Sequence, residues 1–221
     1  AIEDRGYPLS ILRGNRSLYR RHGWERVHAT RTVASDPVPV AADGPADHAD
    51  AELVAYDGRL DDLLAVHRRT VRRTAANVWR TRPVWEDWVF GLGFADPGDV
   101  YLYERGGAVE GYLVVGEREG APVCRELGHV YADDDERDAF LAACWNRLAG
   151  GDCLVWRPPR LPPGAAGASD ALDRERANSA SMRACDPELL SSLAGTAITD
   201  SRDLLAYVQS EPWYWPGLDG F

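Results

Sequence analysis

Between Leu60 and Trp156 the sequence alternates between helical and strand patterns, and this order is what most constrains the fold. Apolar residues recur at helical spacing over residues 60–74, and Pro83 begins a second helical segment that contains Trp85 and Val89. Strand patterns follow over residues 99–104, 108–115 and 122–130, then a helical pattern over 133–148 and a strand over 153–156. The order helix, helix, strand, strand, strand, helix, strand predicts a mixed α/β sheet domain.

Two glycine pairs mark where these elements end. Arg105-Gly106-Gly107 predicts a tight turn between the strands 99–104 and 108–115, which would therefore form a hairpin. Gly150-Gly151 stops the helical pattern before the strand 153–156.

The start of the chain looks like the later part of another domain. Residues 1–6 resemble the last turn of a helix and run into an apolar strand over 7–12. A short helix over 15–22 is closed by Gly23 and followed by a strand over 24–33. We therefore expect residues 1–40 to be the C-terminal part of a first domain whose beginning is not in this chain.

Composition marks the remaining boundaries. Residues 35–50 are rich in Pro, Ala, Asp and Gly without a hydrophobic period, which predicts a linker and a second domain over 51–157. Residues 157–181 are again Pro-, Gly- and Ala-rich and are not expected to pack by themselves. A small C-terminal unit over 182–221 should contain helices over 187–193 and 201–210 and a docked aromatic tail.

The bulk composition excludes several classes of function. The chain has 221 residues, of which 45% are hydrophobic, but it contains neither a membrane-spanning run nor a secretory signal, so a cytoplasmic location is expected. The net charge of -10 disfavours nucleic acid. All 25 basic residues are arginine, which excludes Schiff-base chemistry on lysine. Neither the four cysteines nor the histidines have metal-ligand spacing, so no metal is expected.

The residues that suggest chemistry lie on the short helix over 15–22. Asn15 and Tyr19 are four residues apart and share a helix face, which places an amide and a phenol side by side. A phenol with a pKa of about 10 is well matched to donate a proton to a thiolate with a pKa of about 8.5. The alternative is that Tyr19 only packs against the helix end. Glu126 on a strand could orient a ligand, although a single acid there is more often solvated.

The stretch Asn15-x-x-x-Tyr19-x-x-x-Gly23-Trp24 resembles the closing segment of GNAT acetyltransferases, with Leu18 where that family often has an aromatic residue. The resemblance implies that Asn15 contacts the pantetheine arm of acetyl-CoA and that Tyr19 protonates the departing thiolate. The glycine-rich loop that holds the cofactor's pyrophosphate is not found, because the cluster over residues 91–98 lacks a following helix. Either an upstream portion supplies that loop, or the chain cannot bind the cofactor unaided.

The region 60–156 also resembles a GNAT core, in Arg80-Thr81-Arg82-Pro83-x-Trp85, in the strand 109–115 and in Arg125-Glu126-Leu127. The tandem arrangement is similar to the enhanced intracellular survival family of aminoglycoside N-acetyltransferases, in which the first domain is catalytic and the second is a degenerate copy. That family completes its active site with the terminal carboxylate, which here belongs to Phe221. The alternative is that the tail is frayed.

These observations predict an α/β protein with tandem GNAT-like mixed sheets, the first incomplete, and a small C-terminal unit. The function implied by the resemblance is acetyl-CoA-dependent N-acetyltransfer to a primary amine, aminoglycoside- or polyamine-like, by direct attack. The expected partners are that small-molecule amine and, as an open alternative, further copies of the chain in a homo-oligomer, whereas nucleic acid and membranes are not expected. The rival function is a non-catalytic GNAT-like binding or scaffold protein for a hydrophobic ligand or partner.

Overall fold

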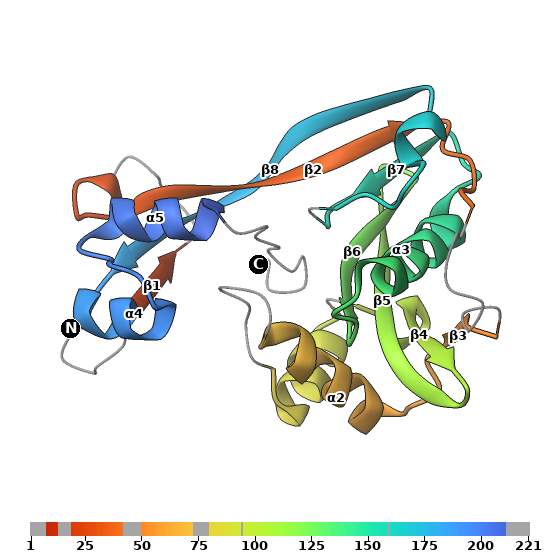
Figure 1. Cartoon of the computed structure of the whole chain (residues 1–221), viewed down its shortest axis with the longest axis horizontal. Coiled ribbons are helices and arrows are strands. Elements are labelled where there is room, and N and C mark those ends of the chain that lie inside the picture. Colours follow the sequence, from red (N-terminus) through yellow and green to blue (C-terminus); the bar gives the residue numbers. More distant parts are fainter. Residues whose placement is uncertain are drawn as a thin grey trace. The chain divides into compact units, whose positions relative to one another are not determined.

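The computed structural model describes residues 8–12, 19–41, 50–72, 80–93, 95–158 and 160–210 (Figure 1). They form two compact units: unit 1 takes the described residues within 1–30 and 176–210, and unit 2 takes those within 31–175. This division differs from the predicted segments 1–40, 51–157 and 182–221, because the first and last parts of the chain group together in unit 1. Two long strands, β2 (Glu25–Ser35) and β8 (Ala171–Ala184), contribute residues to both units.

Unit 2 contains a mixed sheet in which the strand order is β8-β2-β7-β6-β5-β4-β3. Its other strands are β3 (Glu52–Ala55), β4 (Val100–Arg105), β5 (Ala108–Arg118), β6 (Ala121–His129) and β7 (Cys153–Trp156). Strands β3 to β6 are antiparallel neighbours, as are β2 and β7, whereas β6 and β7 run parallel. The predicted mixed α/β architecture is confirmed, and β3 is a strand that the sequence pattern missed.

Two helices cover opposite faces of this sheet, α2 (Leu60–Val71) and α3 (Asp134–Leu148). Successive side chains of a strand point to opposite faces, and β5 divides its residues accordingly. Tyr112 and Val114 pack in one core with α2, and Leu113 packs in the other core with α3. The middle of the sheet is therefore packed between α2 on one face and α3 on the other.

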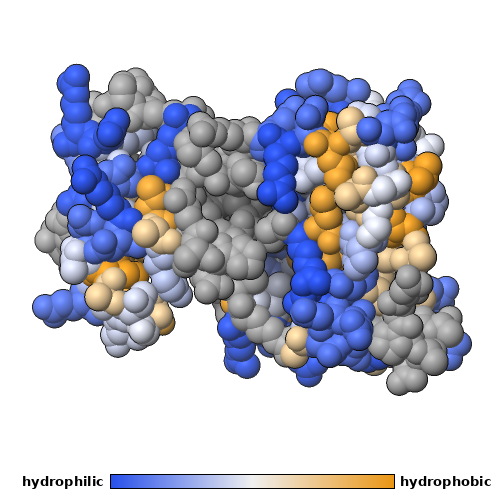
Figure 2. Space-filling view, turned by 45° about the horizontal axis from the view of Figure 1, so that its top comes forward, coloured by the Kyte–Doolittle hydropathy of each residue, from blue (hydrophilic) through white to orange (hydrophobic). Residues whose placement is uncertain are grey.

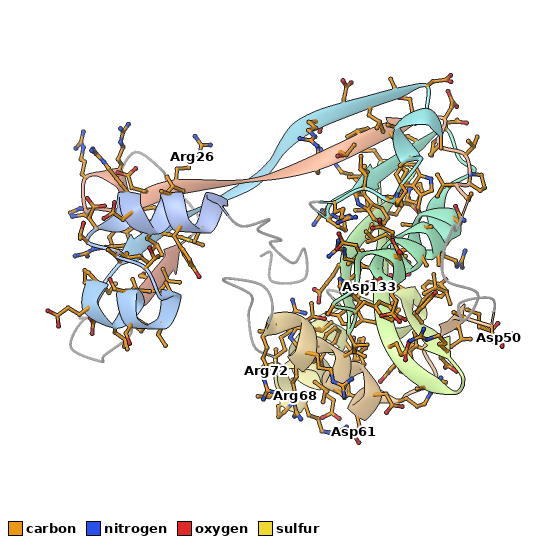
Figure 3. The ribbon with its side chains drawn as sticks, viewed as in Figure 1. Arg26, Asp50, Asp61, Arg68, Arg72 and Asp133 are labelled. Carbon is orange, nitrogen blue, oxygen red and sulfur yellow. The ribbon has the colours of Figure 1, made fainter. Side chains whose placement is uncertain are left out.

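The charges on the two helices follow the helix dipole. Asp61 lies in the first turn of α2 and Arg68 in its last turn, with Arg72 just beyond (Figure 3). The N-cap of helix α3 is Asp133, whose side chain accepts hydrogen bonds from the backbone N–H groups of Asp135 and Glu136 at 2.9 and 3.3 Å. This N-cap explains why the helix starts where the sequence pattern predicted.

The described part of unit 2 also contains three short helices: η3 (Val84–Phe90), η4 (Pro97–Asp99) and η5 (Ala165–Gly167). The helical segment predicted to begin at Pro83 is η3, a π-helix, and Gly91 N–H donates to Glu86 C=O at 2.9 Å across its end. Trp85 and Val89 are buried on it, as their spacing predicted.

The first residues of the predicted linker are fixed on unit 2. Asn146 on α3 accepts a hydrogen bond from Val40 N–H at 2.8 Å and donates to Val40 C=O at 2.9 Å. Trp145 Nε1 donates to Val38 C=O at 2.9 Å. Side chains of α3 therefore fix the backbone at Val38 and Val40, while residues 36, 38 and 39 are exposed, as expected of a connection. Residues 42–49 lie outside the described part of the chain.

Unit 1 has a three-stranded sheet in the order β1-β8-β2, in which β1 (Leu9–Leu12) pairs antiparallel with residues 181–184 of β8. Helices α4 (Pro187–Ala194) and α5 (Ser201–Ser210) follow, as predicted. Its buried apolar side chains are those of Met182, Leu190, Ile198, Leu204 and Val208. Residues 171–181, part of the stretch that was not expected to pack by itself, belong to β8, which lies between β1 and β2 in the sheet.

Across the ranges that the structure describes, every helix is too short or too polar to cross a membrane. In Figure 2 the visible face of unit 2, on the right, carries a band of hydrophobic residues bordered by hydrophilic ones.

Candidate functional site

The predicted catalytic phenol, Tyr19, lies in unit 1, where residues 19–20 are helical and residues 21–23 form a turn. Tyr19 is half-buried, and its carbonyl accepts a hydrogen bond from His22 N–H at 2.9 Å. Gly23 closes the turn at a φ of 82°, a left-handed conformation that glycine adopts without strain. The Tyr19 and Trp24 rings lie 6.0 Å apart, and the Arg183 guanidinium lies 5.0 Å from the centre of the Trp24 ring. Packing against Trp24 thus holds Tyr19 in place.

The other two predicted site residues cannot be placed beside it. Asn15 and Phe221 both lie outside the described residues, so their predicted contacts with the pantetheine arm and with the substrate amine stay predictions.

A second cluster of polar side chains lies buried in unit 2, between α2 and the sheet. The Arg80 guanidinium donates to the Glu126 carboxylate at 2.8 Å, and the Tyr112 hydroxyl donates to the same oxygen at 2.5 Å. His67 Nδ1 lies 3.0 Å from the Tyr112 hydroxyl, while Arg80 N–H donates to His67 Nε2 at 3.3 Å. All four residues are at most 2% exposed, and the Arg80 guanidinium lies over Trp85, 5.2 Å from its ring centre.

A β-bulge explains why Glu126 faces this cluster. Val114 of β5 pairs with Glu126 of β6, and the next residue, Val115, pairs with Cys124. Arg125 is therefore an extra residue between the two pairs. In a regular strand Cys124 and Glu126 would share a face. With the bulge, Cys124 joins the core on the α3 side, and Glu126 reaches the residues on the α2 side.

The ion pair sets the charge state of Glu126. Burial alone would raise the pKa of its carboxyl group, but the charge and hydrogen bond of Arg80, with smaller contributions from His67 and Tyr112, lower the pKa below its ordinary value. Glu126 is therefore ionised at neutral pH and already engaged by Arg80 and Tyr112. A carboxylate held in this way is a poor general base, because its affinity for a proton is reduced.

No pattern in the sequence clearly indicated this cluster. Glu126 was expected to be solvated, and this expectation is wrong because Arg80, 46 positions earlier in the chain, neutralises it in the interior. A usable signal was the glycine at position 128. A Cβ there would lie 2.3 Å from Tyr112 Cε1 and 2.9 Å from Thr70 Oγ1, so only glycine lets the Tyr112 ring cross β6.

The N-terminus of α3 does not fit the pyrophosphate of a coenzyme A cofactor. A phosphate would be held there by unpaired backbone N–H groups and by the positive end of the helix dipole. Asp133 already accepts hydrogen bonds from two of these N–H groups, and Asp134, Asp135 and Glu136 add negative charge to the first turn. Unit 2 therefore offers no acetyl-CoA site at this helix.

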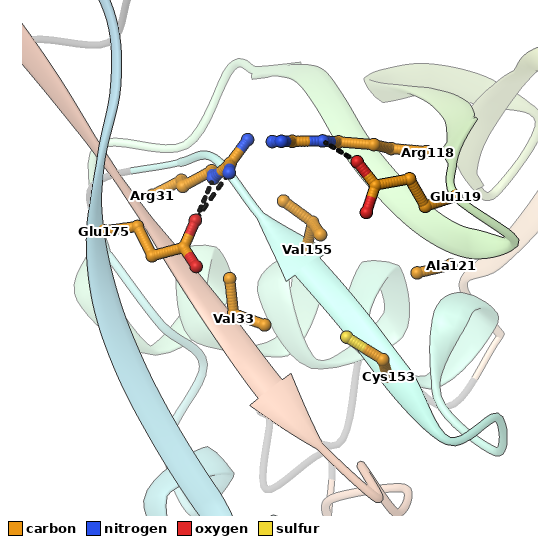
Figure 4. Close-up of a pocket in the computed structure, with 8 residues that line it drawn as sticks. All are labelled: Arg31, Val33, Arg118, Glu119, Ala121, Cys153, Val155 and Glu175. Atoms are coloured by element: carbon orange, nitrogen blue, oxygen red, sulfur yellow. Dashed lines mark hydrogen bonds and ion pairs between the residues drawn. The ribbon is translucent and has the colours of Figure 1, made fainter.

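A pocket with a volume of 230 Å³ lies elsewhere on unit 2, where strands β6 and β7 begin (Figure 4). Its apolar part is formed by Val33, Ala121 and Val155, with Cys153 beside them. Two ion pairs flank it. Arg31 Nε donates to Glu175 at 2.9 Å, and Arg118 Nε lies 3.4 Å from Glu119.

Within the described ranges, no group of three His, Cys, Asp or Glu side chains is placed to hold a metal ion. The four cysteines are all free thiols, of which Cys124 and Cys144 are buried and Cys153 and Cys185 partly exposed.

The fold of these units is that of GCN5-related N-acetyltransferases. The crystal structure of such a protein from Anabaena variabilis matches with a TM-score of 0.54 at 14% identity, covering 84% of this chain and 48% of that one. A GCN5-related N-acetyltransferase from Kribbella flavida matches with a TM-score of 0.52 at 16% identity, covering 87% and 46%. Eis1 from Mycobacterium abscessus matches with a TM-score of 0.56 at 16% identity, covering 89% and 51%.

At these identities the likeness shows the fold, and it confirms the predicted resemblance to GNAT acetyltransferases at that level. The chain spans about half the length of the structures that it matches. No protein-family model and no curated protein matches the sequence.

Proposed function

We propose that this chain is part of a GNAT-type N-acetyltransferase that uses acetyl-CoA and acts on a primary amine, aminoglycoside- or polyamine-like, by direct transfer. The observation that carries the proposal is the fold, which matches GCN5-related N-acetyltransferases over more than four fifths of the chain. We also propose that residues 1–40 close a first GNAT domain, that 51–157 form a second one, and that 182–221 form a C-terminal unit with a docked aromatic tail.

In this proposal unit 2 does not carry out the chemistry. The start of α3 is capped by its own Asp133 and is acidic, and the buried carboxylate of Glu126 is held by Arg80. Neither feature suits a site that must hold a phosphate or accept a proton. Unit 2 then acts as a GNAT-like structural module.

Of the residues proposed to take part, Tyr19 belongs to unit 1, whereas Asn15 and Phe221 are not among the described residues. When bound, acetyl-CoA supplies the acetyl group as an activated thioester. Tyr19 Oη holds the proton that the departing sulfur takes up, and Asn15 binds the pantetheine arm. The carboxylate of Phe221 accepts the proton of the substrate ammonium, provided that burial raises the pKa of that carboxyl group.

The test is acetyl-CoA turnover by the full-length gene product, followed with a thiol-reactive dye in the presence of an aminoglycoside or a polyamine. Tyr19→Phe should lower the rate by about 100-fold or more, since general acid catalysis contributes that much. Tyr207→Phe is the matched control, because Tyr207 is also half-buried in unit 1 and has no proposed role. Equal rates for wild type and Tyr19→Phe would remove Tyr19 from the mechanism. Deletion of Phe221 tests the carboxylate in the same assay.

In the interior of unit 2, Glu126 is already bound by Arg80 and Tyr112. This observation favours one alternative, a non-catalytic GNAT-like binding or scaffold protein for a hydrophobic ligand or partner. It predicts no thiol release with any amine, even in the full-length protein.

A further inference from the structure

The pocket at the starting ends of β6 and β7 has an unusual charge arrangement. Arg31 on β2 and Arg118 at the end of β5 point toward one another across it, above Val155 (Figure 4). Their carboxylate partners, Glu175 and Glu119, lie behind the two guanidinium groups rather than between them. Two cations that face each other repel, and an anion between them would remove that repulsion.

The two arginines differ in how firmly they are held. Arg31 donates through both Nε and Nη2 to Glu175, and its side chain is 14% exposed, so its position is fixed. Arg118 has a single contact of 3.4 Å with Glu119, a side chain that is 83% exposed. Such an exposed pair is worth little, so Arg118 can turn its planar fork of N–H donors to a ligand.

The floor of the pocket selects for an apolar group. Val33 and Val155 are register partners on β2 and β7, and Ala121 adds a third apolar side chain. A volume of 230 Å³ is below the usual range of about 300–1,000 Å³ for drug-sized ligands, so the occupant is a small molecule.

We propose that this pocket binds a small organic carboxylate, with the carboxylate between Arg31 and Arg118 and a short apolar chain on Val33 and Val155. The site lies at the start of β6, whereas the N-terminus of α3 follows the end of that strand. It is therefore separate from the helix N-terminus considered above for a cofactor, and the proposal does not rest on acetyl transfer.

Cys153 makes the proposal testable without an activity, because its thiol lines the same pocket and is partly exposed. Cys124 and Cys144 are fully buried, and burial raises the pKa of both thiols well above the ordinary value, so they should react slowly. A Cys185→Ser background then leaves Cys153 as the reactive thiol. Its modification can be followed by intact-protein mass spectrometry, with the anionic 2-sulfonatoethyl and the cationic 2-(trimethylammonium)ethyl methanethiosulfonates as probes.

We expect the anionic reagent to react several-fold faster than the cationic one, and Arg118→Gln to abolish that preference. Arg174→Gln is the matched control, since it removes the same charge from an exposed residue of β8 that does not line the pocket. Butyrate should slow modification in the millimolar range, whereas butanol should not, and inorganic phosphate should protect less than butyrate.

Three results would overturn the proposal: a charge preference that Arg118→Gln leaves unchanged, no protection by butyrate, or equal protection by phosphate and butyrate. The last would indicate a general anion site without selection for an apolar chain. Circular dichroism of each variant shows whether the fold is kept, and a variant that unfolds is replaced by Arg118→Lys. This change keeps the charge but loses the planar fork, and it should weaken protection by butyrate.

Discussion

The Arg80 guanidinium donates a 2.8 Å hydrogen bond to Glu126 in the interior of unit 2, where neither side chain is more than 2% exposed. The two residues come from the segment before η3 and from the bulge in β6. Each therefore depends on the other for its charge to be tolerated away from water.

Glu126→Gln should destabilise the protein by about 3–5 kcal/mol, because it leaves the Arg80 charge buried without its counter-ion. Chemical denaturation followed by Trp fluorescence measures the free energy of unfolding. Glu119→Gln is the control, since that carboxylate is 83% exposed and should change stability by less than about 0.5 kcal/mol. A loss no greater than that of the control would mean that water or another residue compensates Arg80.

The same ion pair predicts how stability depends on pH. Because the pKa of Glu126 is lowered in the folded state, the unfolded state binds more protons as the solution is acidified. The stabilisation from Glu126 should be complete above the unfolded pKa of about 4.3 and should be lost as pH falls through the folded pKa. Between about pH 3 and 6, the free energy of unfolding should therefore depend less steeply on pH in Glu126→Gln than in the wild-type protein. Parallel profiles for the two proteins would contradict this.

Gly128→Ala should destabilise unit 2 by about 1–3 kcal/mol, as overpacking of a core does. Its Cβ would meet the Tyr112 ring at 2.3 Å, so the ring must move and its hydrogen bond to Glu126 must weaken. Gly98→Ala is the control, because a Cβ at that position would meet no atom within 4 Å. Thermal melts of the two variants test the difference, and equal melting temperatures would show that Tyr112 can shift freely.

Asp133→Ala should cost about 1 kcal/mol, since it removes the side chain that caps α3. Asp135→Ala serves as the comparison, because Asp135 takes part in that cap through its backbone N–H. Urea denaturation should place Asp133→Ala clearly below Asp135→Ala in stability. The reverse order would mean that charge in the first turn matters more than the cap.

Elements with local causes could be predicted from the sequence. The hairpin of β4 and β5 was found because Gly106 and Gly107 both adopt positive φ, of 56° and 82°, as its tight turn requires. Helix α3 was found because Asp133 and the apolar period after it act within a few residues. Strand β8 was missed, since residues 171–184 are mostly polar and are held by pairing with strands far away in sequence.

The candidate site divides in the same way. The turn at Gly23 is local, and the sequence indicated it. The contact of Tyr19 with Trp24 is local as well, but the sequence analysis did not predict it. The pairing of Arg80 with Glu126 is not local, because it needs a bulge whose position only the paired strands define. The convergence of Arg31 and Arg118 likewise arises only when β2 lies next to β7.

Residues 32–35 of β2 come before all other strands of unit 2 in the sequence. They pair with β7, which is the second-to-last strand in chain order. A shortened chain that begins at residue 51 would leave the β7 edge with unsatisfied N–H and C=O groups, and such edges recruit other chains. Expression boundaries drawn from the apparent linker would thus yield aggregates, whereas a start ahead of residue 25 keeps the edge covered.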